Sequence, residues 1–220
     1  MSFPTVTNTS SDLETSGTTS HSITIGAHVS GDLIAVFFTV ESGGSQAVSV
    51  ASGSGGWTIG LEGASSGVFG AFVWKIAGSA YESLVLGTTE SQMSTHITQV
   101  ISPTAGNAIA SVDGTDTTGS STNANPPLHT PAFGSADYLW IVVANINQEN
   151  IASAAPASYS NLQTRISDPG GSSTSIARRT LNATSTDPGA FTSPDAAWVA
   201  STVAIREAAI VPSSFLGFFV

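Results

Sequence analysis

The chain has 220 residues, with 15 acidic and only 5 basic side chains, and its formal net charge is −10. A groove for nucleic acid, or a face for an anionic membrane, needs clustered positive charge, so neither partner is expected. The chain contains no cysteine, so its stability must come from packing or assembly rather than from disulfides. Its length suits one large all-β domain or two small ones.

Residues 1–19 are polar and irregular, and we expect a surface arm or a first edge segment there. They lack the basic and apolar regions of a signal peptide. Apolar or alternating runs follow, and each is typical of a strand. These runs lie at 21–25, 32–40, 67–77, 83–89 and 94–102. No helical periodicity and no apolar run of 18 residues occurs, so we expect an all-β fold without a membrane span.

Residues 111–127 contain almost no large apolar side chain, and we expect a polar linker there. Beyond this linker, six features of the first half return in the same order, at a shift of about 104 residues. They pair His21 with His129, Asp32 with Asp137, Trp57 with Tyr159, Lys75 with Arg179, Glu82 with Asp187, and Ile101 with Ile205. This order indicates an internal duplication, with halves at 20–110 and 128–207.

Four or five strands cannot cover both faces of a separate domain of this size. We therefore predict one jelly-roll-like two-sheet β-sandwich over residues 20–207, built from the two related halves. The run at 32–40 is apolar on both faces. One face should meet the opposite sheet, and loops or a neighbouring subunit should cover the other. Two small sandwiches in tandem are the alternative.

The last segment, 208–220, lies outside the repeat and forms an apolar tail after a Pro-Ser-Ser break. We expect this tail to form a protein interface through five residues, Phe215, Leu216, Phe218, Phe219 and Val220. Burying them would contribute about 1.5–3 kcal/mol for each side chain. The tail would dock on a neighbouring chain, or it would fold back as an edge strand of its own sandwich.

Several short motifs follow one another in a definite order along residues 20–207. They are Ser20-His21, Gly31-Asp32-Leu33, Gly56-Trp57, the run WKIAGSAYE at 74–82, and Ala177-Arg178-Arg179. In this order the chain resembles a group of phage virion structural proteins. The resemblance implies a jelly-roll-like sandwich that decorates a phage head or forms part of a tail, through contacts with other structural proteins.

The sequence contains no complete motif for metal binding, nucleophilic catalysis or phosphate binding. Its histidines lack the close spacing with thiols or carboxylates that a zinc site needs, so we interpret all four as structural; they are His21, His28, His96 and His129. Asp113 and Asp116 lack the other ligands of a calcium loop, and we expect a polar turn there. Neither a nucleophile elbow nor a phosphate-binding glycine loop occurs. We expect no metal, no cofactor and no enzyme activity.

Two cations lie within apolar strands, and a buried cation needs a partner. Glu82 is the expected partner of Lys75. In the second half, Asp187 or Asp168 is expected beside one arginine of the pair 178–179. We interpret both as structural ion pairs.

These observations together predict a non-enzymatic virion component that forms homo-oligomers and binds other virion proteins. The alternative is a carbohydrate-binding module or host-surface adhesin, and a hydrolase grafted on the sandwich is a remote rival. A platform of exposed aromatic rings on one surface would favour glycan binding. The residues that could form it are Trp57, Tyr81 and Tyr159.

Overall fold

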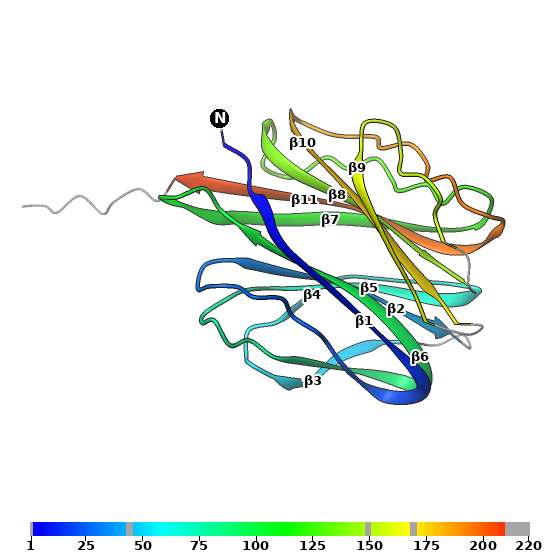
Figure 1. Ribbon diagram of the computed structural model, residues 1–220. Helices are drawn as coiled ribbons and strands as arrows, with labels where there is room; N and C mark the ends of the chain where they lie inside the picture. Colours follow the sequence, from blue (N-terminus) through cyan, green and yellow to red (C-terminus); the bar gives the residue numbers. More distant parts are fainter. Residues whose placement is uncertain (1, 43–45, 148–150, 168–170, 210–220) are drawn as a thin grey trace, which may run out of the picture.

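The computed structural model describes residues 2–42, 46–147, 151–167 and 171–209, which contain strands and no helix (Figure 1). The strands are β1 (Thr5–Ser22), β2 (Leu33–Ser42), β3 (Val48–Gly53), β4 (Thr58–Ser65), β5 (Gly67–Ile76), β6 (Leu84–Ser102), β7 (Asn107–Ser121), β8 (Ala136–Ile146), β9 (Ser160–Ile166), β10 (Ser173–Ala183) and β11 (Ala196–Ala209). The all-β prediction is confirmed.

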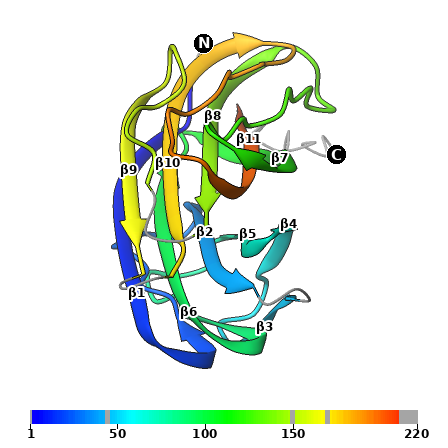
Figure 2. The same ribbon diagram turned by 90° about the vertical axis from the view of Figure 1, so that its right-hand side faces the viewer.

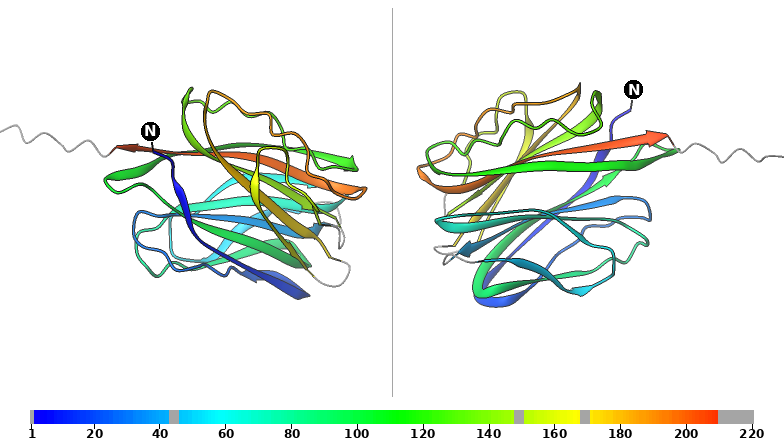
Figure 3. Two further views of the ribbon diagram at one scale, coloured as in Figure 1. Left: turned by 45° about the horizontal axis from the view of Figure 1, so that its top comes forward. Right: turned by 180° about the vertical axis from the view of Figure 1, so that it is seen from behind.

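Each half of the chain forms one antiparallel sheet, and the two sheets pack face to face (Figures 1 and 3). The first sheet has the order β1-β6-β2-β5-β4, with β3 added beside β6. The second has the order β7-β11-β8-β10-β9. The two orders agree when β1, β2, β4, β5 and β6 are matched with β7, β8, β9, β10 and β11. The predicted sandwich of two related halves is therefore confirmed.

The pairing register shows which residues of the two halves are equivalent. In the first sheet Leu33 lies opposite Ile101, and in the second Leu139 lies opposite Ile205. The central strands therefore match at a shift of 106 residues, whereas β5 and β6 match β10 and β11 at 104. Lys75 and Arg179 are equivalent as predicted, because each pairs with the residue after its half's central leucine.

The predicted match of Asp32 with Asp137 is wrong by one residue. The register places Tyr138 at the position equivalent to Asp32. A shift of one residue turns a side chain to the opposite face of a strand. Both central runs are apolar on both faces, so the sequence had no alternation that could fix this register.

The central core lies between the two sheets, and both halves contribute equally to it. Its buried residues are Leu33, Ala35, Phe37, Phe72, Ile97 and Ile101 of the first sheet, and Leu139, Ile141, Val143, Ile176, Val203 and Ile205 of the second. Phe37 and Phe72 stack with ring centroids 5.2 Å apart. Since apolar burial is the main favourable term in folding, this shared cluster joins the two halves into one unit.

The outer face of each sheet has a second apolar cluster of its own. In the first half, β2 turns Ile34, Val36 and Phe38 outward, where β3 and the flanking loops cover them. In the second half, Tyr138, Trp140 and Val142 of β8 face outward beneath loop residues that include Phe191. The chain's own loops therefore cover the outer faces, which explains why β2 and β8 are apolar on both sides.

A buried polar contact joins the two sheets at equivalent positions. The Thr39 hydroxyl lies 2.6 Å from Asn145 Oδ1 and 2.5 Å from the Thr174 hydroxyl. The register makes Thr39 equivalent to Asn145, and Gly70 equivalent to Thr174. Contact between equivalent positions is what a two-fold relation produces. A Cβ on Gly70 would lie 2.0 Å from Asn145 Nδ2, so this position has room for a hydrogen atom only.

Two polar segments that we expected to be irregular are strands. The segment 1–19 contributes most of β1, which pairs with β6 along the edge of the first sheet, so the edge-segment interpretation is correct. The predicted linker at 111–127 is wrong, because residues 107–121 form β7 beside β11. Both strands lie at a sheet edge, where Thr-rich sequences suit a strand with little burial.

Replacing Gly70 by Ala should lower the free energy of unfolding by about 1–3 kcal/mol, because the new methyl group would overlap Asn145. Gly55 is the matched control, since a Cβ there has nothing within 4 Å. Gly55→Ala should change the value by less than about 0.5 kcal/mol. Urea denaturation of both variants checks this. Equal stability of the two variants would contradict the close approach of the sheets at Gly70.

Candidate functional site

Each half places one cation over an aromatic ring at equivalent positions. Lys75 Nζ lies 5.9 Å from the centre of the Trp57 ring, and Arg179 Cζ lies 4.7 Å from the centre of the Tyr159 ring. The repeat predicted both matches, Trp57 with Tyr159 and Lys75 with Arg179. Cation–π attraction of this kind strengthens when the cation is shielded from water, as it is at Lys75.

The ion pair predicted in the first half is confirmed. Lys75 Nζ lies 2.5 Å from Glu82 Oε2, and both side chains are buried. The other carboxylate oxygen of Glu82 accepts hydrogen bonds from the backbone amides of Gly78 and Ser79, at 2.8 and 3.1 Å. Burial raises the pKa of Glu82, but the Lys75 bond and the amide donors outweigh it and bring the pKa to about 2. This pair ties the loop after β5 to the sheet.

The second half closes the same loop with a hydroxyl group instead of a carboxylate. Arg179 donates a hydrogen bond to the Thr186 hydroxyl, seven residues further along, at the spacing of Glu82 from Lys75. The predicted Asp187 partner is therefore wrong by one residue. Asp168 lies outside the described residues. Within the described ranges no carboxylate lies within 4 Å of Arg179.

The three aromatic residues considered for a glycan platform do not share a surface. Tyr159 is only 8% exposed and belongs to the outer cluster of the second half. Trp57 is half-buried, and its indole nitrogen donates to the backbone oxygen of Ser83 at 3.0 Å. Tyr81 alone is freely exposed, at 91%. These three residues therefore do not form the platform that would have favoured glycan binding.

All four histidines make contacts within the fold. His96 Nε2 accepts a hydrogen bond from the Thr24 amide at 3.0 Å, and burial lowers the pKa of His96 to about 4, so its ring is neutral at pH 7. His28 accepts from the Glu82 amide at 3.2 Å. The rings of His21 and His129 pack edge-on against Phe38 and Trp140.

Asp113 and Asp116, the acidic residues considered for a calcium loop, lie in β7. The prediction of a polar turn at these residues is therefore wrong. Asp113 accepts hydrogen bonds from the amides of Gly114 and Ala132, and lies 3.7 Å from His129 Nε2.

The described residues contain no group of three His, Cys, Asp or Glu side chains placed to hold a metal ion. They also contain no helix long and apolar enough to cross a membrane.

One end of the sandwich carries a pocket of about 430 Å³ with mainly apolar walls, which we name the apolar end. Its lining comes from residues 29–32, Ile76 and residues 102–109 around the β6–β7 connection. Val29 is 62% exposed and Ile76 is 39% exposed at this pocket. Ala209, the last residue of β11, pairs with Asn107 of the lining. The predicted interface residues in 215–220 lie outside the described residues.

The edge strands of the two sheets meet along two sides of the sandwich, and these sides differ in how closely the strands pack. On one side β4 meets β7, where the Ser65 hydroxyl donates to the backbone oxygen of Gly119 at 3.0 Å. A Cβ on Gly63 would lie 2.6 Å from Val199 and 2.7 Å from Asp116, and burial raises the pKa of Asp116. On the other side β9 lies beside β1 (Figure 2). Two pockets are lined by residues of both strands there.

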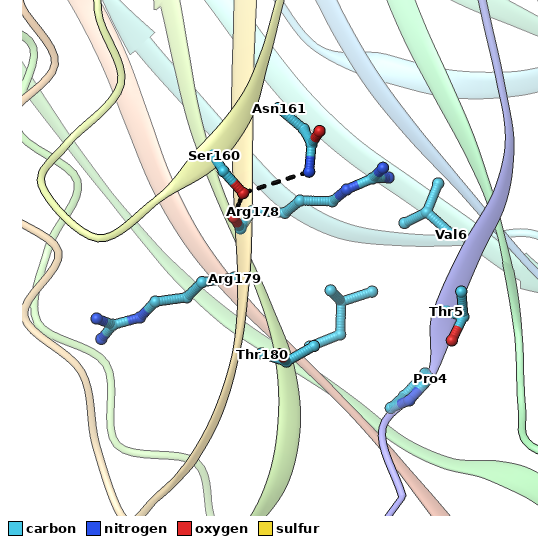
Figure 4. Close-up of a pocket in the computed structure, with 9 residues that line it drawn as sticks. Pro4, Thr5, Val6, Ser160, Asn161, Arg178, Arg179 and Thr180 are labelled. Atoms are coloured by element: carbon cyan, nitrogen blue, oxygen red, sulfur yellow. Dashed lines mark hydrogen bonds between the residues drawn. The ribbon is translucent and has the colours of Figure 1, made fainter.

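One of these two pockets is lined by Arg178, and we name it the seam pocket. It measures about 210 Å³ and is lined by Pro4, Thr5, Val6, Leu139, Ser160, Asn161, Arg178, Arg179 and Thr180. Arg178 and Arg179 leave β10 on opposite sides, so only Arg178 extends toward β1 (Figure 4). Burial lowers the pKa of Arg178. We did not single out this pocket from the sequence, although Arg178 lies two residues from the core position Ile176 and so shares its face.

No protein-family profile, no curated protein and no solved structure matches this chain. Two of its surfaces combine a pocket with exposed apolar or charged side chains, namely the apolar end and the seam pocket.

Replacing Lys75 by Met should lower the free energy of unfolding by about 3–5 kcal/mol, because Glu82 would remain buried without its cation. The double variant Lys75→Met, Glu82→Gln should regain part of this loss. Arg206→Met is the control, since Arg206 stacks on the exposed ring of Phe133 and should contribute less than about 1 kcal/mol. Thermal and urea melts measure all three. Unchanged stability of Lys75→Met would show that the pair is dispensable.

Proposed function

We propose that the protein is a non-enzymatic structural component of a phage particle, which assembles with copies of itself and with other virion proteins through its apolar end. The observation that carries this proposal is the pocket at that end, where Val29 and Ile76 expose apolar surface. Exposed apolar groups around a pocket are typical of protein–protein contact sites.

The occupant that we assign to the apolar end is the segment 215–220 of a second copy. The chain leaves β11 beside this pocket, because Ala209 pairs with Asn107. The segment carries three Phe, a Leu and a Val, and its burial would supply the affinity. Among the described residues, the three apolar clusters draw on residues 6–205. The second repeat of the sequence also ends at residue 207, so we expect the fold not to need the tail.

The assignment to a virion rests on the resemblance over residues 20–207 and on the nature of the surface. With only 9% charged residues, the chain is kept soluble by Ser and Thr side chains and by its acidic excess. A compact sandwich with this surface is suited to a particle in which each copy is held by its neighbours. Its location would be the virion, as a head decoration or a tail component.

The alternative of a carbohydrate-binding module or adhesin has less support. Its distinguishing feature was an exposed aromatic platform, and Tyr159 is buried while Trp57 is half-buried. Of the three residues considered for the platform, Tyr81 has the one freely exposed ring. Stacking platforms need aromatic faces that a sugar can reach, so host glycan binding is the second candidate only.

Deleting residues 211–220 should leave a folded sandwich and weaken its self-association, because both sheets and the central core of the described residues lie before residue 210. Sedimentation velocity and thermal melting of the same truncated protein measure the two effects. We expect a melting temperature close to that of the full chain, together with a shift toward monomer. A truncated chain that melts much lower but assembles normally would show that the tail is an edge strand of its own sandwich.

The acceptor side of this contact is tested by Val29→Asp in the full chain. A carboxylate in the apolar pocket should weaken assembly as strongly as the deletion does. Tyr81→Asp is the matched control, because Tyr81 is more exposed than Val29 but does not line the pocket. Assembly that survives Val29→Asp would place the tail elsewhere. Immunodetection in purified phage particles tests the virion assignment itself.

A further inference from the structure

The seam pocket marks a place where the two halves of the repeat differ. By the pairing register, Arg178 is equivalent to Trp74. Trp74 pairs with Ala35 of β2, and Arg178 pairs with Ile141, the equivalent residue of β8. In the first half, the Trp74 ring fills this position and packs against the central core. In the second half, an arginine replaces the indole, and a pocket of about 210 Å³ is present beside it.

The arginine in this pocket is not neutralised by the protein. Its Nη1 is buried from solvent and makes no hydrogen bond to any described residue. Among the described residues, no acidic side chain lines the pocket and none lies within 4 Å of the guanidinium group. An arginine without an acidic partner attracts a carboxylate, and Arg178 lines the pocket, so the pocket is suited to a ligand that supplies this group.

Further polar groups lie beside the guanidinium group. Asn161 has a positive φ of 56°, and its amide lies next to Arg178, where it also donates to the Ser160 hydroxyl at 3.3 Å (Figure 4). The opposite wall is apolar, with Pro4 just before β1 and Val6 within it. The pocket thus combines a planar cation and an amide with an aliphatic wall.

We propose that the seam pocket binds the side-chain carboxylate of a Glu or Asp residue carried by an extended segment of a partner protein. Arginine holds a carboxylate through two parallel hydrogen bonds, and this geometry gives both strength and direction. The aliphatic wall would contact the methylene stem of the bound residue. The pocket lies between β1 and β9, which are both edge strands, and such edges pair readily with an extended segment.

The lining favours a protein carboxylate over an acidic sugar. A sugar ring brings several hydroxyl groups that need partners, and none of the described residues that line the pocket offers an aromatic ring for stacking. A polyanion is disfavoured by the net charge of −10, whereas a single carboxylate needs only the local field of Arg178. This inference rests on the proposed function, because it gives the chemistry of one contact with a virion partner.

The test uses the full chain and two peptides that differ in one group, acetyl-TVEVT-amide and acetyl-TVQVT-amide. Titrations followed by NMR should show the Glu peptide shifting the backbone amide signals of Asn161 and Arg178. We expect the Gln peptide to bind at least tenfold more weakly. Arg178→Gln should remove the difference between the peptides, whereas Arg206→Gln, on the exposed Phe133 ring, should keep it.

Three results would overturn the inference. They are equal binding of the two peptides to the unmodified chain, binding of neither, or glucuronate binding at Arg178 at least tenfold more tightly than the Glu peptide. The last result would assign the pocket to an acidic sugar. Sedimentation of Arg178→Gln separates this inference from the proposed function, because assembly through the apolar end should be unchanged when peptide binding is lost.

Discussion

The structure depends on apolar contact between two sheets that cannot each be buried alone. Every residue of the central core faces the other half of the chain, and the two halves supply equal numbers of them. A sheet with one apolar face is stable only when that face is covered, and here the repeat covers itself. The remaining features follow from this arrangement. The outer faces of β2 and β8 need their own covers, and the loops of each half provide them.

The candidate binding features lie where the two halves differ from one another. At one seam β4 and β7 approach closely around Gly63, and at the other β1 and β9 leave pockets. The position filled by Trp74 in the first half carries Arg178 in the second. A duplicated fold can change one copy of a position while the other copy maintains packing. The same reasoning applies to Glu82 and Thr186, which close equivalent loops with different chemistry.

The sequence was sufficient for the strand class, the duplication, the sandwich and the Lys75–Glu82 pair. These depend on runs of apolar residues and on a cation that needs a partner. It was insufficient at β7, because an edge strand buries little and its Thr-rich sequence looks like a linker. It also missed the register of Asp137, since a shift of one residue leaves no trace in a run that is apolar on both faces. The partner of Arg179 was missed for another reason: a carboxylate was expected there, and the Thr186 hydroxyl accepts the hydrogen bond instead. The seam pocket depends on packing across the two sheets, which no local pattern encodes.

The measurement that tests the account most directly is the folding of the two halves as separate chains, residues 1–104 and 105–209. Because the central core is divided equally between them, each fragment alone should lack a cooperative unfolding transition and should give poorly dispersed NMR amide signals. Mixing and refolding the two fragments together should restore the dispersed spectrum of the sandwich. A single fragment that unfolds cooperatively as a monomer would show that each half is an independent domain, and would contradict the shared core.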